Sequence, residues 1–239
     1  MNIMPDKIGE HNEVAILIPT LKRPDRILQV YENAKGSSPN ITKVYFVAER
    51  EDRESIDELE KHHLSYFINE RSANYAGALN TAYLKTLERY FFCGADDLDF
   101  KAGWLEKCLA KMVDPIKIVG TNDLHFRPVI IGEQATHFLV DREYIKTRSG
   151  IFDAENLVLP ECYAHFSIDR EVIELARLRG VFAPCLEAVV EHLHWSYGLS
   201  PKDETYARHD VDIYRDNQLY LRRRKLMFIK IRAERNLLI

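Results

Sequence analysis

The sequence is poor in cysteine and has no long apolar run. Its four cysteines lie far apart and form no CxxC pair, which favours reduced thiols in a reducing compartment. No apolar run approaches the roughly 18 residues that a membrane-spanning helix needs. Residues 1–12 are polar and lack the apolar core of a signal peptide. We therefore expect a soluble protein of the cytoplasm.

An excess of positive charge and the common phosphate-binding loops are also missing. The formal net charge is −4, which argues against a nucleic-acid binder that uses its whole surface. Neither GxGxxG nor GxxxxGK[ST] occurs, so a dehydrogenase-like or P-loop protein would lack its phosphate loop. The 239 residues, of which 46% are hydrophobic, suffice for one large domain or two small ones.

What the first hundred residues do contain is a regular alternation of apolar runs and amphipathic segments. Apolar runs predict strands, and apolar residues at helical spacing predict helices between them. The predicted strands are 14–18, 43–48, 65–68 and 90–93, and the predicted helices are 26–34, 50–63 and 76–90, the last with Leu87 facing inward. This alternation is typical of a parallel α/β sheet with helices on both faces. In such sheets ligands bind beyond the carboxyl ends of the strands.

Polar residues follow the predicted strands at these ends, above all in the acidic stretch after Cys93. Three carboxylates, Asp96, Asp97 and Asp99, lie within four residues. Acids clustered at the end of a buried strand repel one another and are costly to desolvate. Mg²⁺ or Mn²⁺ would relieve both problems because these ions prefer hard oxygen ligands. A solvated acidic turn would explain this stretch equally well.

The second half of the chain is less regular. Short strands are predicted at 116–119, 136–140 and 188–190, and an amphipathic helix at 168–179 ends before Gly180. The tail, from about residue 203 to 239, is predicted to be helical and carries the basic run Arg222–Lys225, with further basic residues after it and with Tyr214, Tyr220 and Phe228 interspersed. Such a run fits a nucleic-acid or anionic surface, or the solvated face of a terminal helix.

Several segments, taken in order, resemble the GT-A-fold glycosyltransferases, in particular the large family 2 of inverting enzymes. The matching segments are 14–20, 77–80, the acids followed by Gly103-Trp104-Leu105, Asp169 eleven residues before Gly180, and 184–192. The resemblance covers roughly residues 14–195. It implies a GT-A, Rossmann-like, mostly parallel central sheet flanked by helices, with a C-terminal helical tail. The catalytic domain would span 1–200, with a nucleotide-binding half at 14–100 and an acceptor half at 101–200, and 201–239 would be a helical extension.

The resemblance also implies roles for residues at the strand ends. The positions expected to bind the nucleotide sugar are Pro19, Thr20, Lys22, Arg23, Glu49, Asn80 and Asp96. Leu79 stands where the family commonly has an arginine. Glu49 could instead be a solvated acid before a charged helix.

The metal ligands and the catalytic base follow from the same resemblance. Alignment on Gly103-Trp104-Leu105 places the main metal-ligand aspartate at Asp97, with Asp99 and His192 completing a Mn²⁺ or Mg²⁺ site. Asp169 is expected to be the catalytic base, although an aspartate at a helix start is often only a cap. His192 could instead be a packed, hydrogen-bonded residue at the edge of a strand rather than a metal ligand.

The implied reaction is a metal-dependent, inverting transfer of a sugar from a nucleotide-diphosphate donor, with UDP favoured, to an acceptor hydroxyl. A sugar-nucleotide nucleotidyltransferase and a catalytically silent binding module are the alternatives, but no basic glycine-rich loop follows the first strand. The acceptor could be a glycan, a small molecule or modified DNA. The last would fit a phage enzyme that glycosylates hydroxymethylated bases. The C-terminal helix could also form a homodimer contact.

Overall fold

The computed structural model describes residues 13–209 and 212–236; expectations that concern residues 1–12, 210–211 and 237–239 lie outside that range. Its centre is an eight-stranded sheet with the order β3-β2-β1-β4-β7-β6-β8-β5. The strands are β1 (Val14–Thr20), β2 (Ile41–Ala48), β3 (Tyr66–Ile68), β4 (Tyr90–Cys93), β5 (Leu98–Phe100), β6 (Ile118–Asn122), β7 (Phe138–Asp141) and β8 (Phe182–His192).

The first four strands of the chain pair with one another in parallel. β1 pairs in parallel with both β2 and β4, and β2 pairs in parallel with β3. β7 joins β4 and β6 in antiparallel fashion, β8 lies parallel to β6, and β5 runs antiparallel at the edge. β1 and β4 are buried along almost their whole length, as expected for strands covered on both faces.

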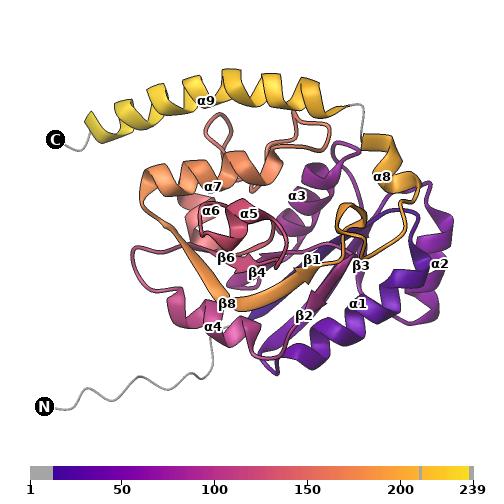
Figure 1. The fold of residues 1–239 in the computed structure, drawn as a ribbon. Coiled ribbons are helices and arrows are strands. Elements are labelled where there is room, and N and C mark those ends of the chain that lie inside the picture. The colour runs from indigo at the N-terminus through magenta and orange to yellow at the C-terminus, as the bar shows by residue number, and fades with distance from the viewer. Residues whose placement is uncertain (1–12, 210–211, 237–239) are drawn as a thin grey trace, which may run out of the picture.

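Helices cover both faces of this sheet (Figure 1). The helices are α1 (Pro24–Ser37), α2 (Arg53–Lys61), α3 (Tyr75–Lys85), α4 (Trp104–Lys111), α5 (Arg127–Ile130), α6 (Arg142–Arg148), α7 (Ile168–Arg179), α8 (Glu204–His209) and α9 (Ile213–Asn236), with a 3₁₀ turn at Trp195–Tyr197. α1, α2 and α4 bury their apolar sides in the cluster on one face. α3, α6 and α7 do so on the other face. This three-layer arrangement confirms the predicted GT-A-like fold with its C-terminal helix.

Some boundaries differ from the sequence prediction. α3 ends at Lys85, and Leu87, predicted to face inward, is 87% exposed because the backbone is extended from Thr86 onward. β5 was not predicted, and β8 is much longer than the expected strand at 188–190. The tail forms two described helices, α8 and α9. The division of the chain into a catalytic domain and an extension after residue 200 stays a prediction.

α9 is fixed to the body at several points. The fully buried carboxylate of Asp216 accepts hydrogen bonds from the backbone N–H groups of residues 164, 165 and 166 at 2.8–3.1 Å. Arg223 forms ion pairs with buried Glu171, at 2.7 Å, and with Asp153, at 2.6 Å. Met227 and Ile231 pack against Leu175 of α7.

None of the described helices combines the length and the apolarity that a bilayer crossing requires.

Candidate functional site

A cavity of about 1200 Å³ opens at the carboxyl ends of β1 and β4 and continues along α7 toward α9. Its wall at the strand ends includes Pro19, Thr20, Arg23, Glu49, Asp96, Asp97 and His192. Its wall along the helices includes Asp169, Arg170, Glu174, Arg177, Tyr220 and Arg224. We call these the strand-end wall and the helix wall. The sheet positions the first wall because parallel strands end at one edge, as the sequence predicted.

Asp96 is held at the centre of the strand-end wall by two donors. The Thr20 hydroxyl donates to its Oδ2 at 2.9 Å, and Arg23 Nη1 donates to its Oδ1 at 2.7 Å. Both the Asp96 and the Arg23 side chains are less than one-tenth exposed. Burial raises the pKa of Asp96 to about 6, against the attraction of Arg23, which lowers it. The contact therefore ties the loop after β1 to the end of β4.

Asp97 is surrounded by donors but keeps one oxygen free of them. Its Oδ2 accepts a hydrogen bond from the Tyr206 hydroxyl at 2.6 Å and lies 3.3 Å from His192 Nε2. Burial opposes ionisation, but His192, Tyr206 and Arg23 together hold the pKa of Asp97 well below its usual value. Its Oδ1 is buried without a hydrogen-bond partner among the described residues. A buried, ionised carboxylate with a free oxygen is suited to binding a cation.

α8 closes over these acids from the far end of the chain. Asp203, just before the helix, accepts hydrogen bonds from Arg23 Nε at 2.8 Å and Nη2 at 3.2 Å. The Arg23 guanidinium lies 4.2 Å from the centre of the Tyr206 ring, and Thr205 donates to the carbonyl of Leu21. These contacts place Tyr206 against Asp97. Sequence reasoning missed this closure because nothing in the tail marks Asp203 or Tyr206 as partners of residues about 180 and 110 positions earlier.

Asp169 lies at the start of α7, in the helix wall of the same cavity. Its Oδ2 accepts a hydrogen bond from Gln134 Nε2 at 3.3 Å. Burial raises the pKa of Asp169 above its ordinary value, and the Gln134 hydrogen bond opposes that shift. A carboxylate with a raised pKa and a weak hydrogen bond is suited to accepting a proton. The N-cap residue of α7 is Ser167, but the backbone N–H groups of Asp169 and Arg170 also lower the pKa of the Asp169 carboxyl, so its contact with the helix start remains an alternative role.

His137, which the sequence did not single out, also lines the cavity. The contact between its Nδ1 and the carbonyl of Cys93, at 3.0 Å, requires Nδ1 to carry the proton. Burial lowers the pKa of His137 to about 3, so its ring is neutral near pH 7. Its Nε2 is buried and has no hydrogen-bond partner among the described residues. That nitrogen carries no proton and is therefore available as a hydrogen-bond acceptor.

Three residues expected in the site lie outside the cavity lining. Asp99 accepts hydrogen bonds from Asn33 at 2.8 Å and Lys101 at 2.6 Å, because β5 alternates and turns Leu98 and Phe100, its neighbours, into the core. Lys22 donates its backbone N–H to Asp52 and its side chain to exposed Glu204. These positions give Asp99 and Lys22 structural contacts away from Asp97.

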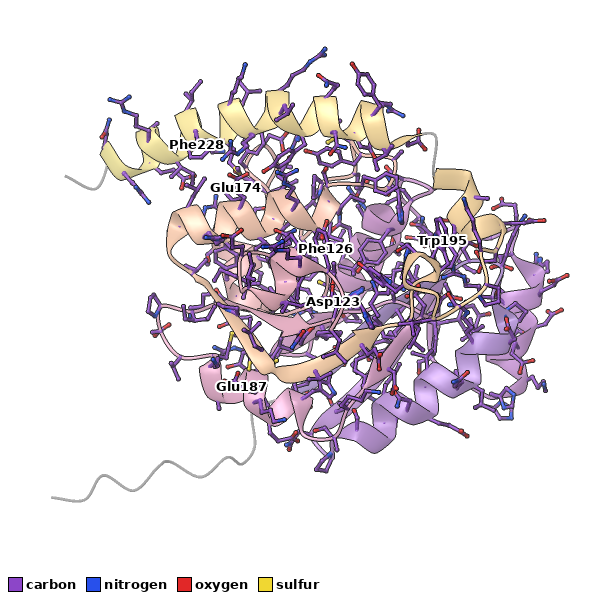
Figure 2. The ribbon with its side chains drawn as sticks, viewed as in Figure 1. Asp123, Phe126, Glu174, Glu187, Trp195 and Phe228 are labelled. Carbon is purple, nitrogen blue, oxygen red and sulfur yellow. The ribbon has the colours of Figure 1, made fainter. Side chains whose placement is uncertain are left out.

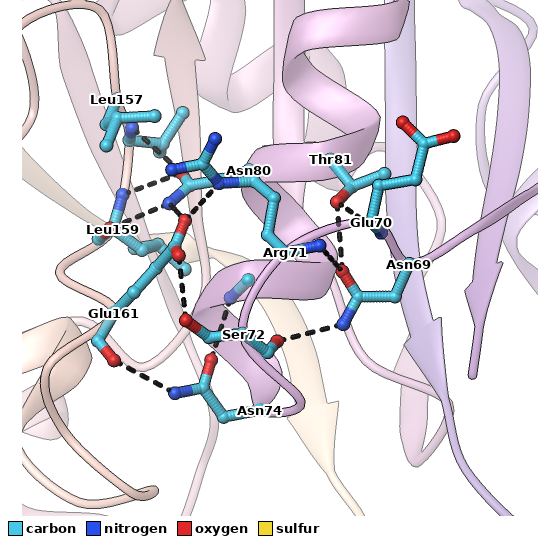
Figure 3. A network of polar contacts seen from close by, with 12 residues as sticks. Asn69, Glu70, Arg71, Ser72, Asn74, Asn80, Thr81, Leu157, Leu159 and Glu161 are labelled. Carbon is cyan, nitrogen blue, oxygen red and sulfur yellow. Dashed lines mark hydrogen bonds and ion pairs between the residues drawn. The ribbon is translucent and has the colours of Figure 1, made fainter. Parts of the chain in front are cut away.

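Asn80 is the third such residue, and its amide is fully used within the protein (Figure 3). Its Oδ1 accepts from the backbone N–H groups of Val158 and Leu159, and its Nδ2 donates to Leu159 and Glu161. The nearby Gly77 is also structural, since a Cβ there would lie 2.0 Å from the carbonyl oxygen of Ser72. The 77–80 segment therefore shapes the start of α3 and anchors the loop at 157–161.

The residues that could hold a divalent cation are few. Within residues 13–209 and 212–236, no group of three or more His, Cys, Asp and Glu side chains is arranged around a common point. Asp97 and His192 are adjacent, and Asp97 Oδ1 is free. Mg²⁺ and Mn²⁺ sites in nucleotide enzymes often use one or two protein ligands and complete the shell with phosphate oxygens and water. The strand-end wall fits a cation that binds together with a phosphate-bearing ligand.

Comparison with known families identifies the chain. The sequence profile described as glycosyl transferase family 2 matches residues 15–175, which are 161 of the 239 residues. The chain therefore belongs to glycosyl transferase family 2 and is a glycosyltransferase. Comparison with curated protein sequences finds no significant match.

Similar solved structures support the same fold at low sequence identity. A mannosyltransferase from Pyrobaculum calidifontis, solved with GDP-mannose and Mn²⁺, shares 13% identity with a TM-score of 0.62 and covers 94% of this chain. Glucosyl-3-phosphoglycerate synthase from Mycobacterium tuberculosis, solved with Mn²⁺, UDP and phosphoglyceric acid, shares 9% identity with a TM-score of 0.55 and covers 76%. The chain matches 64% and 70% of those two proteins' own lengths.

Proposed function

We propose that this family 2 glycosyltransferase moves a sugar from a nucleoside-diphosphate sugar to an acceptor hydroxyl, with a divalent cation at Asp97 and inversion at the anomeric carbon. The observation that carries the proposal is that Asp97, His192 and Asp169 all line one cavity. The cation-binding candidates belong to its strand-end wall and the base candidate to its helix wall. A donor and an acceptor can thus occupy the two parts of one cavity.

The strand-end wall would bind the donor. Pro19, Thr20 and Glu49 line it beside Asp96. Arg23, whose pKa is raised by Asp96 although burial opposes this, keeps its positive charge next to the expected position of the diphosphate. Glu49 accepts a hydrogen bond from Asn69 at 2.8 Å, which holds the acid at the end of β2 where it can reach a nucleotide base or ribose. Lys22 and Asn80 would act only through the loops that they stabilise.

Asp97 and His192 would hold Mn²⁺ or Mg²⁺ together with the diphosphate of the donor. When bound, the cation supplies Lewis-acid stabilisation of the negative charge that gathers on the departing diphosphate. Tyr206 donates to Asp97 Oδ2 and leaves Oδ1 for the cation. Such outer hydrogen bonds orient a ligand carboxylate and keep it ionised.

Asp169 would act on the acceptor. Its carboxylate takes the proton of the acceptor hydroxyl while the hydroxyl oxygen forms the new bond to the anomeric carbon and the bond to the diphosphate breaks. With a single attack from the face opposite the leaving group, the anomeric configuration inverts. The raised pKa of Asp169 makes it a stronger base than an exposed aspartate. Gln134 fixes the orientation of its carboxylate through the hydrogen bond to Oδ2.

Thermal stabilisation by nucleotides tests this proposal. UDP, GDP, dTDP and CDP are each added with and without Mn²⁺, because a ligand present at about 100 times its Kd adds about 2.7 kcal/mol to the folded state. We expect one nucleotide to stabilise the protein strongly only with Mn²⁺. The matching nucleotide sugar is then incubated with candidate acceptors, and release of the diphosphate is measured. Stabilisation by none of the four pairs would contradict the proposal.

A further inference from the structure

α9 has one side committed to the protein and one side turned outward. Asp216, Tyr220, Met227 and Ile231 are the buried residues and lie along one side of the helix. Figure 1 shows α9 along the outside of the molecule above α7, with no other helix or strand of the described residues beyond it. With about 100° of rotation per residue, the residues opposite the buried side follow from the sequence. We call them the outer face: Tyr214, Arg215, Gln218, Leu221, Arg222, Lys225, Leu226, Ile229, Arg232, Ala233 and Asn236.

The outer face combines basic and apolar side chains and contains no acid. Arg215, Arg222, Lys225 and Arg232 supply its positive charge. Its large apolar side chains are exposed to solvent: Tyr214 is 74% exposed, Ile229 67%, Leu226 56% and Leu221 49%. The two acids of α9 lie elsewhere: Asp216 is fully buried, and Glu234 contacts Arg148 and Arg179.

The charge of the outer face is also largely uncompensated. Arg223, on the side of the helix that packs on the body, is paired with Glu171, and Arg224, at its edge, is paired with Glu174, which lies between α7 and α9 (Figure 2). On the outer face only Arg215 has an ion pair within the described residues, to Asp212 at 4.0 Å. A protein with a net charge of −4 thus concentrates positive charge on one exposed helix face.

We propose that the outer face of α9 binds an anionic lipid surface, with the helix lying flat at the headgroup level. Basic residues attract anionic headgroups. The exposed Leu, Ile and Tyr side chains between them leave water when they enter the boundary between headgroups and acyl chains, which is favourable. The helix is about 36 Å long at 1.5 Å per residue, which lets all four basic residues reach one plane. The proposal does not depend on which nucleotide or acceptor the cavity takes.

The apolar members distinguish a lipid surface from the other possible partners. Nucleic-acid phosphates would use Arg222, Lys225 and Arg232 but would leave Leu226 and Ile229 in water. A second copy packed through the same face would bring the basic residues of two helices together without an acid between them, which is unfavourable. A surface that is both anionic and apolar below its headgroups satisfies both kinds of side chain.

Vesicle binding by the full-length protein tests the proposal. Co-sedimentation is measured with phosphatidylcholine vesicles containing about 30% phosphatidylglycerol, and with vesicles of phosphatidylcholine alone, at roughly 0.1 M salt. One variant, Arg222→Gln/Lys225→Gln, removes charge from the outer face. A second, Leu226→Ser/Ile229→Ser, removes its apolar residues. The matched control, Lys43→Gln/Arg53→Gln, removes two exposed basic residues from β2 and α2. Thermal melting confirms that each variant is folded.

We expect binding that requires phosphatidylglycerol, about 25-fold weaker in the charge variant and roughly tenfold weaker in the apolar variant, with the control unchanged. Nucleotide binding with Mn²⁺ should be the same in all four proteins, which separates this test from that of the proposed function. Absence of binding to the anionic vesicles would overturn the proposal. So would binding to a DNA oligonucleotide that the charge variant loses and the apolar variant keeps, or a dimer that only the apolar variant dissociates.

Discussion

The two walls of the cavity differ in how their charges are held. In the strand-end wall Arg23, Asp96 and Asp97 are buried and contact one another, and Tyr206 and His192 complete the set. In the helix wall Arg170 and Arg177 are exposed and the Asp169 carboxylate has one hydrogen bond to a side chain, that of Gln134, while Glu174 contacts Tyr220 and Arg224 farther along. A wall whose charged side chains are buried and paired suits the diphosphate of a donor, and a wall with exposed arginines suits an acceptor that must enter and leave. The predictions below test this difference, from the largest expected effect to the smallest.

Removal of the central acid of the strand-end wall should have the largest effect. Asp97→Ala removes the oxygen proposed to bind the cation, while Arg23 keeps its ion pairs with Asp96 and Asp203. We expect sugar transfer to fall at least ~10³-fold, since a catalytic cation contributes several kcal/mol. Nucleotide stabilisation that depends on Mn²⁺ should disappear as well. Turnover within tenfold of the wild type would show that Asp97 has no such role.

Asp169→Asn tests the helix wall in the same assay. The amide keeps the size and the contact with Gln134 but cannot accept a proton, so we expect kcat to fall by ~10²–10⁴-fold. Nucleotide binding with Mn²⁺ should be unchanged because the strand-end wall is intact. Loss of binding and turnover together would mean that the two walls are not separate in function.

The stability of the helix wall depends on the anchor of α9. Asp216→Ala removes a buried carboxylate that accepts from three partly buried backbone N–H groups, and we expect a loss of about 2–4 kcal/mol in the free energy of unfolding. Urea denaturation measures this loss. Asp212→Ala, which removes a partly exposed acid from the same end of α9, is the matched control and should cost less than about 1 kcal/mol. Equal effects would show that Asp216 is not a special anchor.

The pH profile reports the state of Asp169. Because burial raises its pKa and the base acts only when ionised, kcat should fall as the pH drops through a value above the ordinary pKa of an aspartate. The Gln134 hydrogen bond lowers that pKa, so Gln134→Leu should move the acidic limb of the profile to higher pH. An acidic limb that moves to lower pH, or does not move, would contradict the assignment of Asp169 as the base.

The smallest effect is expected at Asp99. Its carboxylate contacts Asn33 and Lys101 outside the cavity, so Asp99→Asn should change turnover by no more than about threefold. The comparison with Asp97→Ala, two positions earlier, is the sharpest available within the acidic stretch. A loss at Asp99 as large as that at Asp97 would mean that the cation site includes β5.

The sequence predicted the strand-end wall better than the helix wall, for physical reasons. The apolar runs at 14–18 and 90–93 predict buried strands, and parallel strands bring Thr20, Glu49 and Asp97 to one edge. From the sequence, Asp99 is grouped with Asp97 because three acids lie within four residues, and β5 was not predicted. The alternation of Leu98 and Phe100 around Asp99 is a signal that its side chain points away from the core.

The closing contacts depend on tertiary structure that no local pattern encodes. Tyr206 and Asp203 meet Asp97 and Arg23 only after the chain has passed through the whole sheet and back over the β1–α1 loop. Asn80 belongs to the 77–80 segment that resembles the family. Its four hydrogen bonds go to the loop at 157–161, and the sequence of that loop has no helix or strand pattern from which the contact could be predicted. His137 lies in a predicted strand, and its role depends on the free Nε2 that only side-chain geometry reveals.

The most direct test of the cation site is the electron spin-echo spectrum of Mn²⁺ bound with the nucleotide that stabilises the protein most. Protein containing ¹⁵N-labelled histidine is compared with its His192→Phe variant. If Asp97 and His192 hold the cation, the wild type shows a Mn–nitrogen coupling that is absent from the variant. A wild-type spectrum without histidine coupling, or a coupling that survives in the variant, would contradict the proposed ligand pair.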